Sequence, residues 1–223
     1  MLVITGTLFF FHHRGHGGHG VLLIKQKKLC VLCALCGEFP YLCSVMEKFE
    51  LHILGCGSAL PTTRHFATSQ VVNVRDKLYM IDCGEGSQLQ FRKSRLKFSR
   101  LNHIFISHLH GDHCFGLLGL ISTLNLLGRT AELHIHSPKG LEALFAPMLS
   151  FFCRQMTYKV LFHEFETKEP GMIYEDRSLT VTTIPLRHRM PCCGFLFAEK
   201  QRPNHIIREM VDFYEVPVYE LNR

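Results

Sequence analysis

A histidine-rich loop joins an apolar strand to an apolar helix near the middle of this 223-residue chain, and this junction constrains the fold more than any other feature. The loop reads HLHGDH, from His108 to His113, between an expected strand at 103–107 and an expected helix at 113–127. A loop that leaves the end of a strand can turn three imidazoles and the Asp112 carboxylate toward one point. These nitrogen and oxygen ligands suit zinc. The sequence therefore predicts a sheet with a metal site at its strand ends.

Strands and helices alternate along the rest of the chain. Apolar residues at every second position predict half-buried strands, and longer apolar stretches with capping residues predict helices. Further strands are expected at 49–54, 70–74, 78–82, 132–136, 159–166, 179–185 and 194–198, and helices at 87–97, 113–127, 138–151 and 204–214. Ser137 and Pro138 suit the start of one helix, and Gly128 suits the end of another. The mixture predicts a layered α/β architecture.

The first 45 residues differ in composition from the rest. Segment 12–20 holds four histidines and four glycines, and Cys30, Cys33 and Cys36 follow with two residues between neighbours. One interpretation is a leader of uncertain status, disordered or non-native. The other is a metal-binding knuckle. In either case, we expect the folded domain to occupy 46–223.

Composition excludes several classes of protein. The chain is 47% hydrophobic and 20% charged, which fits a globular domain and not a disordered or collagen-like one. We find no run of about 20 apolar residues, so no membrane-spanning helix is expected. The ten cysteines do not follow a secreted disulfide framework, so we expect a reducing, cytoplasmic compartment. The net charge of +6 and 15 histidines favour a metal or a polyanion as partner.

The spacing within the loop favours two metal ions. His108 and His110 are two residues apart and can bind one ion, while Asp112 and His113 are offset toward a second. Two ions about 3.5–4 Å apart can lower the pKa of a shared water and stabilise both oxygens of a phosphodiester during cleavage.

The run FISHLHGDH resembles the signature of the metallo-β-lactamase superfamily. The segments LGCGSALP (54–61), MIDCGEGSQ (80–88) and PLRHRMPCCGF (185–195) resemble, in sequence and in order, those of the ribonuclease Z family of tRNA 3′-processing endonucleases. The resemblance covers about 46–223. It implies an αββα sandwich, here incomplete at the C-terminus, because two later motifs of that family, which supply a bridging aspartate and a last histidine ligand, would follow Arg223.

The resemblance also implies roles for particular residues. One zinc would be bound by His108, His110 and His188, and the second by Asp112 and His113. Asp112 would also act as the general base on the metal-bound water. Asp82 would support the metal site from behind the ligands. From its position alone, Asp82 could either orient an imidazole N–H or be a turn aspartate before Gly84.

Two features bear on partners. Five cations lie within nine residues, and they could contact the backbone of a precursor tRNA or form a solvated helix face; they are Arg92, Lys93, Arg95, Lys97 and Arg100. The apolar stretch 115–127 carries too many leucines and isoleucines for one exposed stripe. It could pack on the sheet, or be partly buried in the homodimer that the family forms.

Three functions stay open at this point. The first is a zinc-dependent endoribonuclease that removes the 3′ trailer from precursor tRNA. The second is another hydrolase of the superfamily, acting on a thioester, a lactam or a small phosphodiester. The third is a non-catalytic fragment that binds RNA.

Overall fold

The computed structural model describes residues 2–4, 21–22, 49–60, 62–200 and 213. The predicted leader at 1–45, apart from two short strands, and the predicted helix at 204–214, apart from Phe213, lie outside the described residues. Within the described ranges the chain forms one larger and one smaller sheet. The larger has seven strands in the order β2 (Val21–Leu22), β3 (Phe49–Gly55), β4 (Ser69–Val74), β5 (Lys77–Ile81), β6 (Leu101–Phe105), β7 (Leu133–Pro138) and β8 (Val160–Phe165).

The smaller sheet has the order β1 (Leu2–Ile4), β11 (Cys193–Glu199), β10 (Leu179–Pro185) and β9 (Met172–Glu175). All its pairs are antiparallel. In the larger sheet β2 to β5 pair antiparallel, whereas β5, β6, β7 and β8 run parallel. The carboxyl ends of these parallel strands therefore meet at one edge, where the histidine loop begins.

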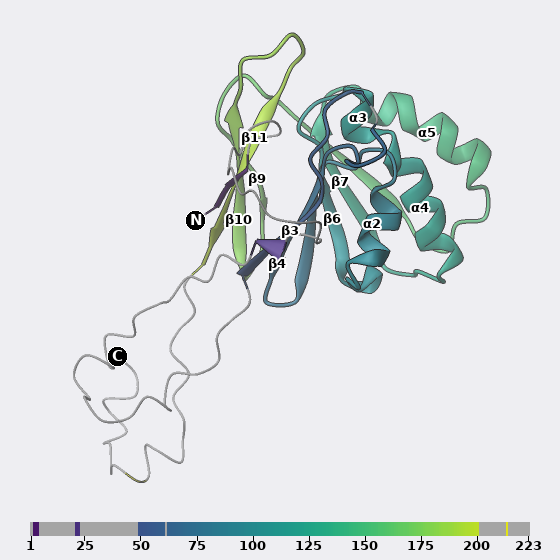
Figure 1. Ribbon diagram of the computed structural model, residues 1–223, viewed down its shortest axis with the longest axis horizontal. Helices are drawn as coiled ribbons and strands as arrows, with labels where there is room; N and C mark the ends of the chain where they lie inside the picture. The colour runs from purple at the N-terminus through teal and green to yellow at the C-terminus, as the bar shows by residue number, and fades with distance from the viewer. Residues whose placement is uncertain (1, 5–20, 23–48, 61, 201–212, 214–223) are drawn as a thin grey trace.

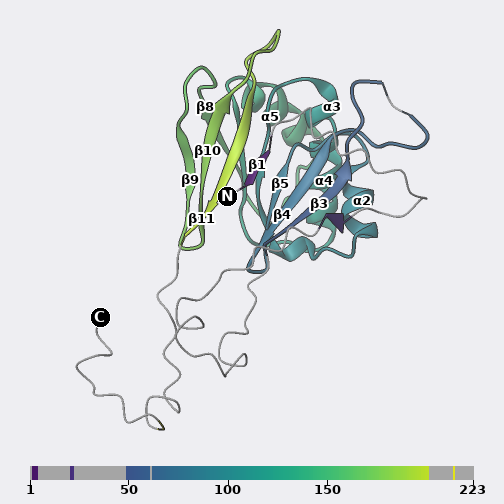
Figure 2. The same ribbon diagram turned by 60° about the vertical axis from the view of Figure 1, so that its left-hand side comes forward.

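Helices cover the outer face of the larger sheet (Figure 1, Figure 2). They are α2 (Ser87–Lys93), the short α3 (Gly111–Cys114), α4 (Gly116–Leu126) and α5 (Leu141–Phe152). Alternation along the strands creates two cores. Ile104 and Ile106 face the helices, whereas Phe105 faces the smaller sheet and packs with Phe195 and Phe197. The predicted mixed α/β architecture is confirmed.

Three helix boundaries differ from the predictions. The helix expected at 138–151 begins at Leu141, because Pro138 continues the β7 ladder opposite Phe165 and Gly140 turns the chain at φ 105°. The helix expected at 87–97 ends at Lys93, since Arg95 takes a left-handed conformation at φ 56°. The helix expected at 113–127 is divided into α3 and α4, although Gly128 does end it, at φ 73°.

Strand β9 was not predicted, and neither were the two short strands β1 and β2. Strand β9 pairs with β10 after a tight turn, in which Asp176 Oδ1 accepts hydrogen bonds from the backbone N–H groups of Ser178 (2.6 Å) and Leu179 (2.9 Å). Its four residues are too few for a clear alternation, and the aspartate turn supplies the missing signal.

The apolar stretch 115–127 divides into two parts. Leu117, Leu120, Ile121 and Leu124 are fully buried in the core between α4 and the sheet, as the packing interpretation requires. Leu126 and Leu127 at the end of α4 are exposed. Within the described ranges, no helix is long and apolar enough to cross a membrane.

Candidate metal centre

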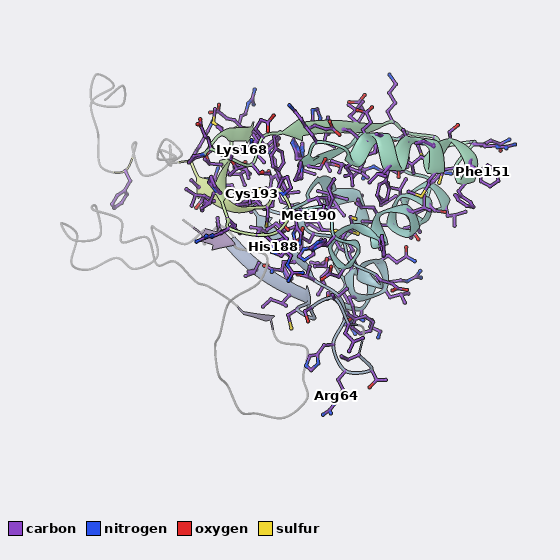
Figure 3. All side chains as sticks on the ribbon, turned by 90° about the horizontal axis from the view of Figure 1, so that it is seen from above. Arg64, Phe151, Lys168, His188, Met190 and Cys193 are labelled. Carbon is purple, nitrogen blue, oxygen red and sulfur yellow. The ribbon has the colours of Figure 1, made fainter. Side chains whose placement is uncertain are left out.

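Three segments from different parts of the chain meet at one edge of the fold. Asp82 follows β5, the loop from Ser107 to His113 follows β6, and His188 lies in the connection between β10 and β11. Figure 3 labels His188 and Met190 in this connection, close to the middle of the molecule when it is seen from above. The segments that follow these strands thus bring Asp82 and the five predicted metal ligands to one edge of the fold.

Three histidine nitrogens converge. His108 Nε2 lies 3.0 Å from His110 Nδ1, and His188 Nε2 lies 3.3 Å from the same atom. Each pair of the three ligand atoms lies within 4.8 Å. Ligands at roughly 2.0–2.1 Å from a tetrahedral zinc are about 3.3 Å apart, so the spacing fits an ion among them.

The remaining two predicted ligands lie next to this group. His113 Nε2 is 3.5 Å from Asp112 Oδ2, and the His113 ring centroid is 3.9 Å from that of His108. Among the residues that the structure describes, only His108, His110 and His188 form a group of three or more convergent donors. Asp112 and His113 therefore make an adjacent pair, not a complete ligand set.

A buried hydrogen-bond network lies behind the histidines. Asp82 Oδ1 accepts the backbone N–H of Ser107 (2.8 Å), and Asp82 Oδ2 accepts the Ser107 hydroxyl (3.0 Å). Asp82 Oδ2 also lies 2.7 Å from His113 Nδ1. The contact fits the interpretation in which Asp82 orients an imidazole, and its backbone takes a left-handed conformation at φ 55°.

The network gives neighbouring histidines opposite pKa shifts. Burial first, and then the nearby histidines, lower the pKa of His108 to about 3. Burial also lowers the pKa of His113, but its hydrogen bond to Asp82 and the charges of Asp82 and Asp112 outweigh this, so the net pKa is raised. A neutral imidazole is the form that binds a metal, and His108 is held in that form.

Backbone contacts fix the loop from both sides. Cys83 N–H donates to the carbonyl of His113 (2.8 Å), and Gly116 N–H donates to the carbonyl of Cys83 (2.9 Å). On the other side, Cys193 N–H donates to the carbonyl of Ser107 (3.1 Å). Gly116 is required here, since a Cβ at this position would lie 2.1 Å from the carbonyl oxygen of Gly84.

The predicted basic residues are not brought to this site. Arg92, Lys93, Arg95 and Lys97 are exposed, and Arg100 pairs with Asp76 at 2.8 Å. Arg100 directly precedes β6 and His108 lies beyond its other end, so at about 3.3 Å per residue the two are roughly 20 Å apart.

Sequence reasoning missed three residues at the site. Arg187 and Arg189 flank His188 and are both exposed, which the run RHR could have signalled. Ser107 is fully buried at the centre of the network, and the only signal was a small polar residue at the end of an apolar strand.

The fold and the histidine site define a class, the metallo-β-lactamase superfamily. Human tRNase Z, short form, is 30% identical, with a TM-score of 0.63 over 68% of this chain and 66% of that chain. YhfI of Bacillus subtilis, a metallo-β-lactamase fold protein, is 17% identical with a TM-score of 0.53, over 66% of this chain and 58% of that chain, and shows the fold alone. This fold implies a metal cofactor, and the three histidines are suited to hold it.

The family within this class follows from the sequence. A family model described as "Anti-Pycsar protein Apyc1" matches residues 49–205, and the chain belongs to this family. Ribonuclease Z of Bacteroides thetaiotaomicron is 85% identical over 178 residues, which are 80% of this chain and 56% of that protein. Ribonuclease Z of Bacteroides fragilis is 83% identical over 80% of this chain and 59% of that protein. The chain thus spans little more than half the length of these relatives. The predicted resemblance to ribonuclease Z is confirmed.

Proposed function

We propose that this chain belongs to a zinc-dependent endoribonuclease that removes the 3′ trailer from precursor tRNA. The observation that carries the proposal is the convergence of the nitrogens of His108, His110 and His188, in a chain 85% identical to a ribonuclease Z over 178 residues. The relatives supply the substrate class, and the site supplies the chemistry.

The proposal assigns the ligand roles that the family resemblance implies, and the convergence of three histidine nitrogens supports the first of them. His108, His110 and His188 hold one zinc, and Asp112 and His113 contribute to a second, together with groups outside the described residues. When bound, zinc would stabilise charge on the phosphate and lower the pKa of the attacking water.

Two carboxylates have different tasks in this proposal. Asp112 accepts the proton of the attacking water, which suits its partial exposure of 14%. Asp82 is only 2% exposed, so it does not reach substrate and instead holds the His113 ring by its Nδ1. This division assigns proton transfer to Asp112 and support of the ligands to Asp82.

The surroundings of His188 suit a polyanion. Arg187 and Arg189 are exposed and flank His188 in the sequence, so two cations are available to contact the phosphates next to the scissile bond. The basic residues 92–100 form a second region at the other end of β6, which a substrate as long as tRNA can reach. RNA binding by either region is part of the proposal, since each phosphate neutralised by Lys or Arg adds affinity.

Two further parts of the proposal concern the assembly and its place in the cell. The exposed end of α4, at Leu126 and Leu127, offers apolar surface for a homodimer.

The cytoplasm is the compartment that fits the proposal, because it holds precursor tRNA and keeps thiols reduced. The thiols of Cys114 and Cys192 are buried, which raises the pKa of each to about 11, so they stay protonated.

A second candidate is another hydrolase of the superfamily. It is favoured by the description of the matching family model, which does not name a ribonuclease. The two candidates share the metal site and differ in substrate.

Cleavage of a precursor tRNA labelled in its 3′ trailer tests the proposal, using protein with its native termini. We expect trailer release that stops when a chelator removes the metal and returns with added zinc. Asp112→Asn should abolish cleavage, whereas Asp76→Asn, the same change at an exposed ion pair, should not. Hydrolysis of small phosphodiesters or thioesters with intact tRNA would favour the second candidate. RNA binding without cleavage at any zinc concentration would favour a non-catalytic protein.

A further inference from the structure

Ser107 occupies the centre of the network behind the metal ligands. It follows β6 and has no exposed surface. Its hydroxyl oxygen lies 3.0 Å from Asp82 Oδ2, 3.0 Å from His108 Nδ1 and 3.2 Å from His113 Nδ1. One hydroxyl thus contacts one predicted ligand of each zinc.

The protons in this network can be assigned from the chemistry of the groups. A hydroxyl has one hydrogen to donate and two lone pairs to accept with, whereas an ionised carboxylate only accepts. The Ser107 O–H therefore donates to Asp82 Oδ2. Its lone pairs are left to accept, so His108 Nδ1 must carry a hydrogen and donate it to Ser107. His113 Nδ1 donates to Asp82 Oδ2, its shortest contact at 2.7 Å.

This assignment fixes which nitrogen of each ring can bind a metal. A neutral imidazole carries one N–H, so a hydrogen on Nδ1 leaves the lone pair on Nε2. His108 Nε2 is the atom that faces His110, and His113 Nε2 is the atom that faces Asp112. Both lone pairs thus point into the site.

We infer that Ser107 is a positioning residue, which selects the Nδ1–H tautomer of His108 directly and steadies His113 through Asp82. This inference rests on the proposed function, since it says how the ligands of that site are prepared. Contacts of this kind, made to ligands from behind, typically change metal affinity about 10–100-fold when they are removed.

The backbone of Ser107 allows the hydroxyl to be tested alone. Its N–H donates to Asp82 Oδ1 at 2.8 Å, and its carbonyl accepts from Cys193 N–H at 3.1 Å. Both bonds are independent of the side chain. Ser107→Ala therefore removes the contact to His108 and leaves the backbone attachments of the loop in place.

The neighbouring strand offers a matched control. Ser137 lies in β7, next to β6 and parallel to it, and it is also fully buried. Its hydroxyl has no hydrogen-bond partner in the part of the chain that the structure describes. Ser137→Ala makes the same chemical change at the same burial and removes no hydrogen bond to His108 or His113.

The experiment compares the 223-residue chain with Ser107→Ala, Ser107→Thr and Ser137→Ala. Nitrogen-15 NMR of the histidine side chains, without metal, reads the tautomer of His108, and titration with zinc reads affinity. The chain and Ser137→Ala should show Nδ1–H at His108. Ser107→Ala should lose this preference and bind zinc about 10–100-fold more weakly. Ser107→Thr, which keeps the hydroxyl, should retain both the Nδ1–H tautomer of His108 and the zinc affinity of the unchanged chain.

Several outcomes would overturn the inference. One is a Ser107→Ala protein with an unchanged tautomer and unchanged zinc affinity. Another is a folded Ser107→Thr protein that matches Ser107→Ala in both readouts. If Ser107→Ala does not fold, Ser107→Cys places a thiol there, which is a weaker hydrogen-bond acceptor than a hydroxyl, and must lower the Nδ1–H preference instead. Protein with its native termini that shows the expected tautomer but cuts no RNA would contradict the proposed function and leave the inference standing.

Discussion

Two groups of histidines lie in the part of the chain that the structure describes, and they are built in different ways. The metal-site group is His108, His110 and His188. The second group, here the histidine ladder, comes from three neighbouring parallel strands; it comprises His103 on β6, His134 and His136 on β7, and His163 on β8. In the metal-site group the rings are nearly perpendicular, at 72°, 77° and 80°. In the ladder they are nearly parallel, at 17° to 29°.

The difference follows from where the residues start. Side chains on one face of neighbouring strands project in the same direction, so the ladder rings stack and their nitrogens meet in pairs. The pairs are His134 Nδ1 with His163 Nε2, at 2.9 Å, and His103 Nδ1 with His136 Nε2, at 3.3 Å. Residues in loops beyond the strand ends can instead turn toward a common point. Histidines therefore predict a metal site by their position at strand ends more than by their number.

The largest expected effect is the difference in zinc affinity between two variants, each of which lacks one histidine from one of the two groups. His110→Ala deletes the atom that both other ligands approach, so we expect zinc affinity to fall by more than about 100-fold, beyond the usual effect of a supporting contact. His134→Ala should change it less than about twofold. Calorimetric titration of both variants with zinc measures this. Equal losses would mean that the ladder also contributes to zinc binding.

The loop that holds the metal-site group should be sensitive to one added methyl group. Gly116→Ala would place a Cβ 2.1 Å from a backbone carbonyl oxygen, and we expect a loss of about 1–3 kcal/mol in unfolding free energy. Gly119→Ala in the same helix meets the flexible side chain of Gln88 at 2.9 Å, and should cost less. Urea unfolding of the two variants provides the comparison. A Gly119→Ala protein that is as destabilised as Gly116→Ala would contradict this account of the loop.

The ladder should make the fold sensitive to acid. Burial first, and then the neighbouring histidines, lower the pKa of His103 and of His136 to about 3. In the unfolded chain both would titrate near 6.5, so their contribution to stability is present above that pH and is lost as the pH falls from 6.5 toward 3. Within this window, each of these two histidines lowers the unfolding free energy by about 1.4 kcal/mol for every pH unit.

His136→Phe tests this origin of the acid sensitivity. It removes one of these two groups and keeps an aromatic ring against Phe105, whose centroid lies 4.5 Å from that of His136. Unfolding free energy measured between pH 7.5 and 5.5 should therefore fall less steeply in the variant, by about 1 kcal/mol over that range. An unchanged slope would show that the acid sensitivity arises elsewhere.

The smallest expected effect concerns the charges around the two groups. Arg187 and Arg189 flank His188 in the sequence, whereas Glu132 lies 3.9 Å from His134 in the ladder. Replacing both arginines with alanine should make the negative slope of log affinity for tRNA against log salt shallower by about two. Lys97→Ala, in the basic region 92–100, should make this slope shallower by no more than about one. Binding measured over a salt series decides between them, and a larger effect at Lys97 would favour the region 92–100 as the main RNA contact.

Much of the fold could be predicted from the sequence, because the alternation along each strand is strong and the histidine loop lies directly after one of them. The predicted start of α5 was wrong because Pro138 pairs with β8, and this tertiary contact overrides the preference of proline for a helix start. His188 lies 75 residues beyond His113. Only the resemblance to a family indicated it, since no local pattern connects the two segments.

The contacts of Ser107 were beyond sequence reasoning for a different reason. The partners of Ser107 come from three places in the chain, and the role of a hydroxyl depends on which groups surround it. The ladder was missed because its members are single histidines on separate strands, and it exists only after those strands are paired in register.

Anomalous scattering at the zinc edge, from crystals grown with zinc, tests the central claim most directly. We predict a peak between His108 Nε2, His110 Nδ1 and His188 Nε2, at about 2.0–2.1 Å from each nitrogen. The ladder should show none. A peak between His134 and His163, or no peak at the three converging nitrogens, would contradict the account.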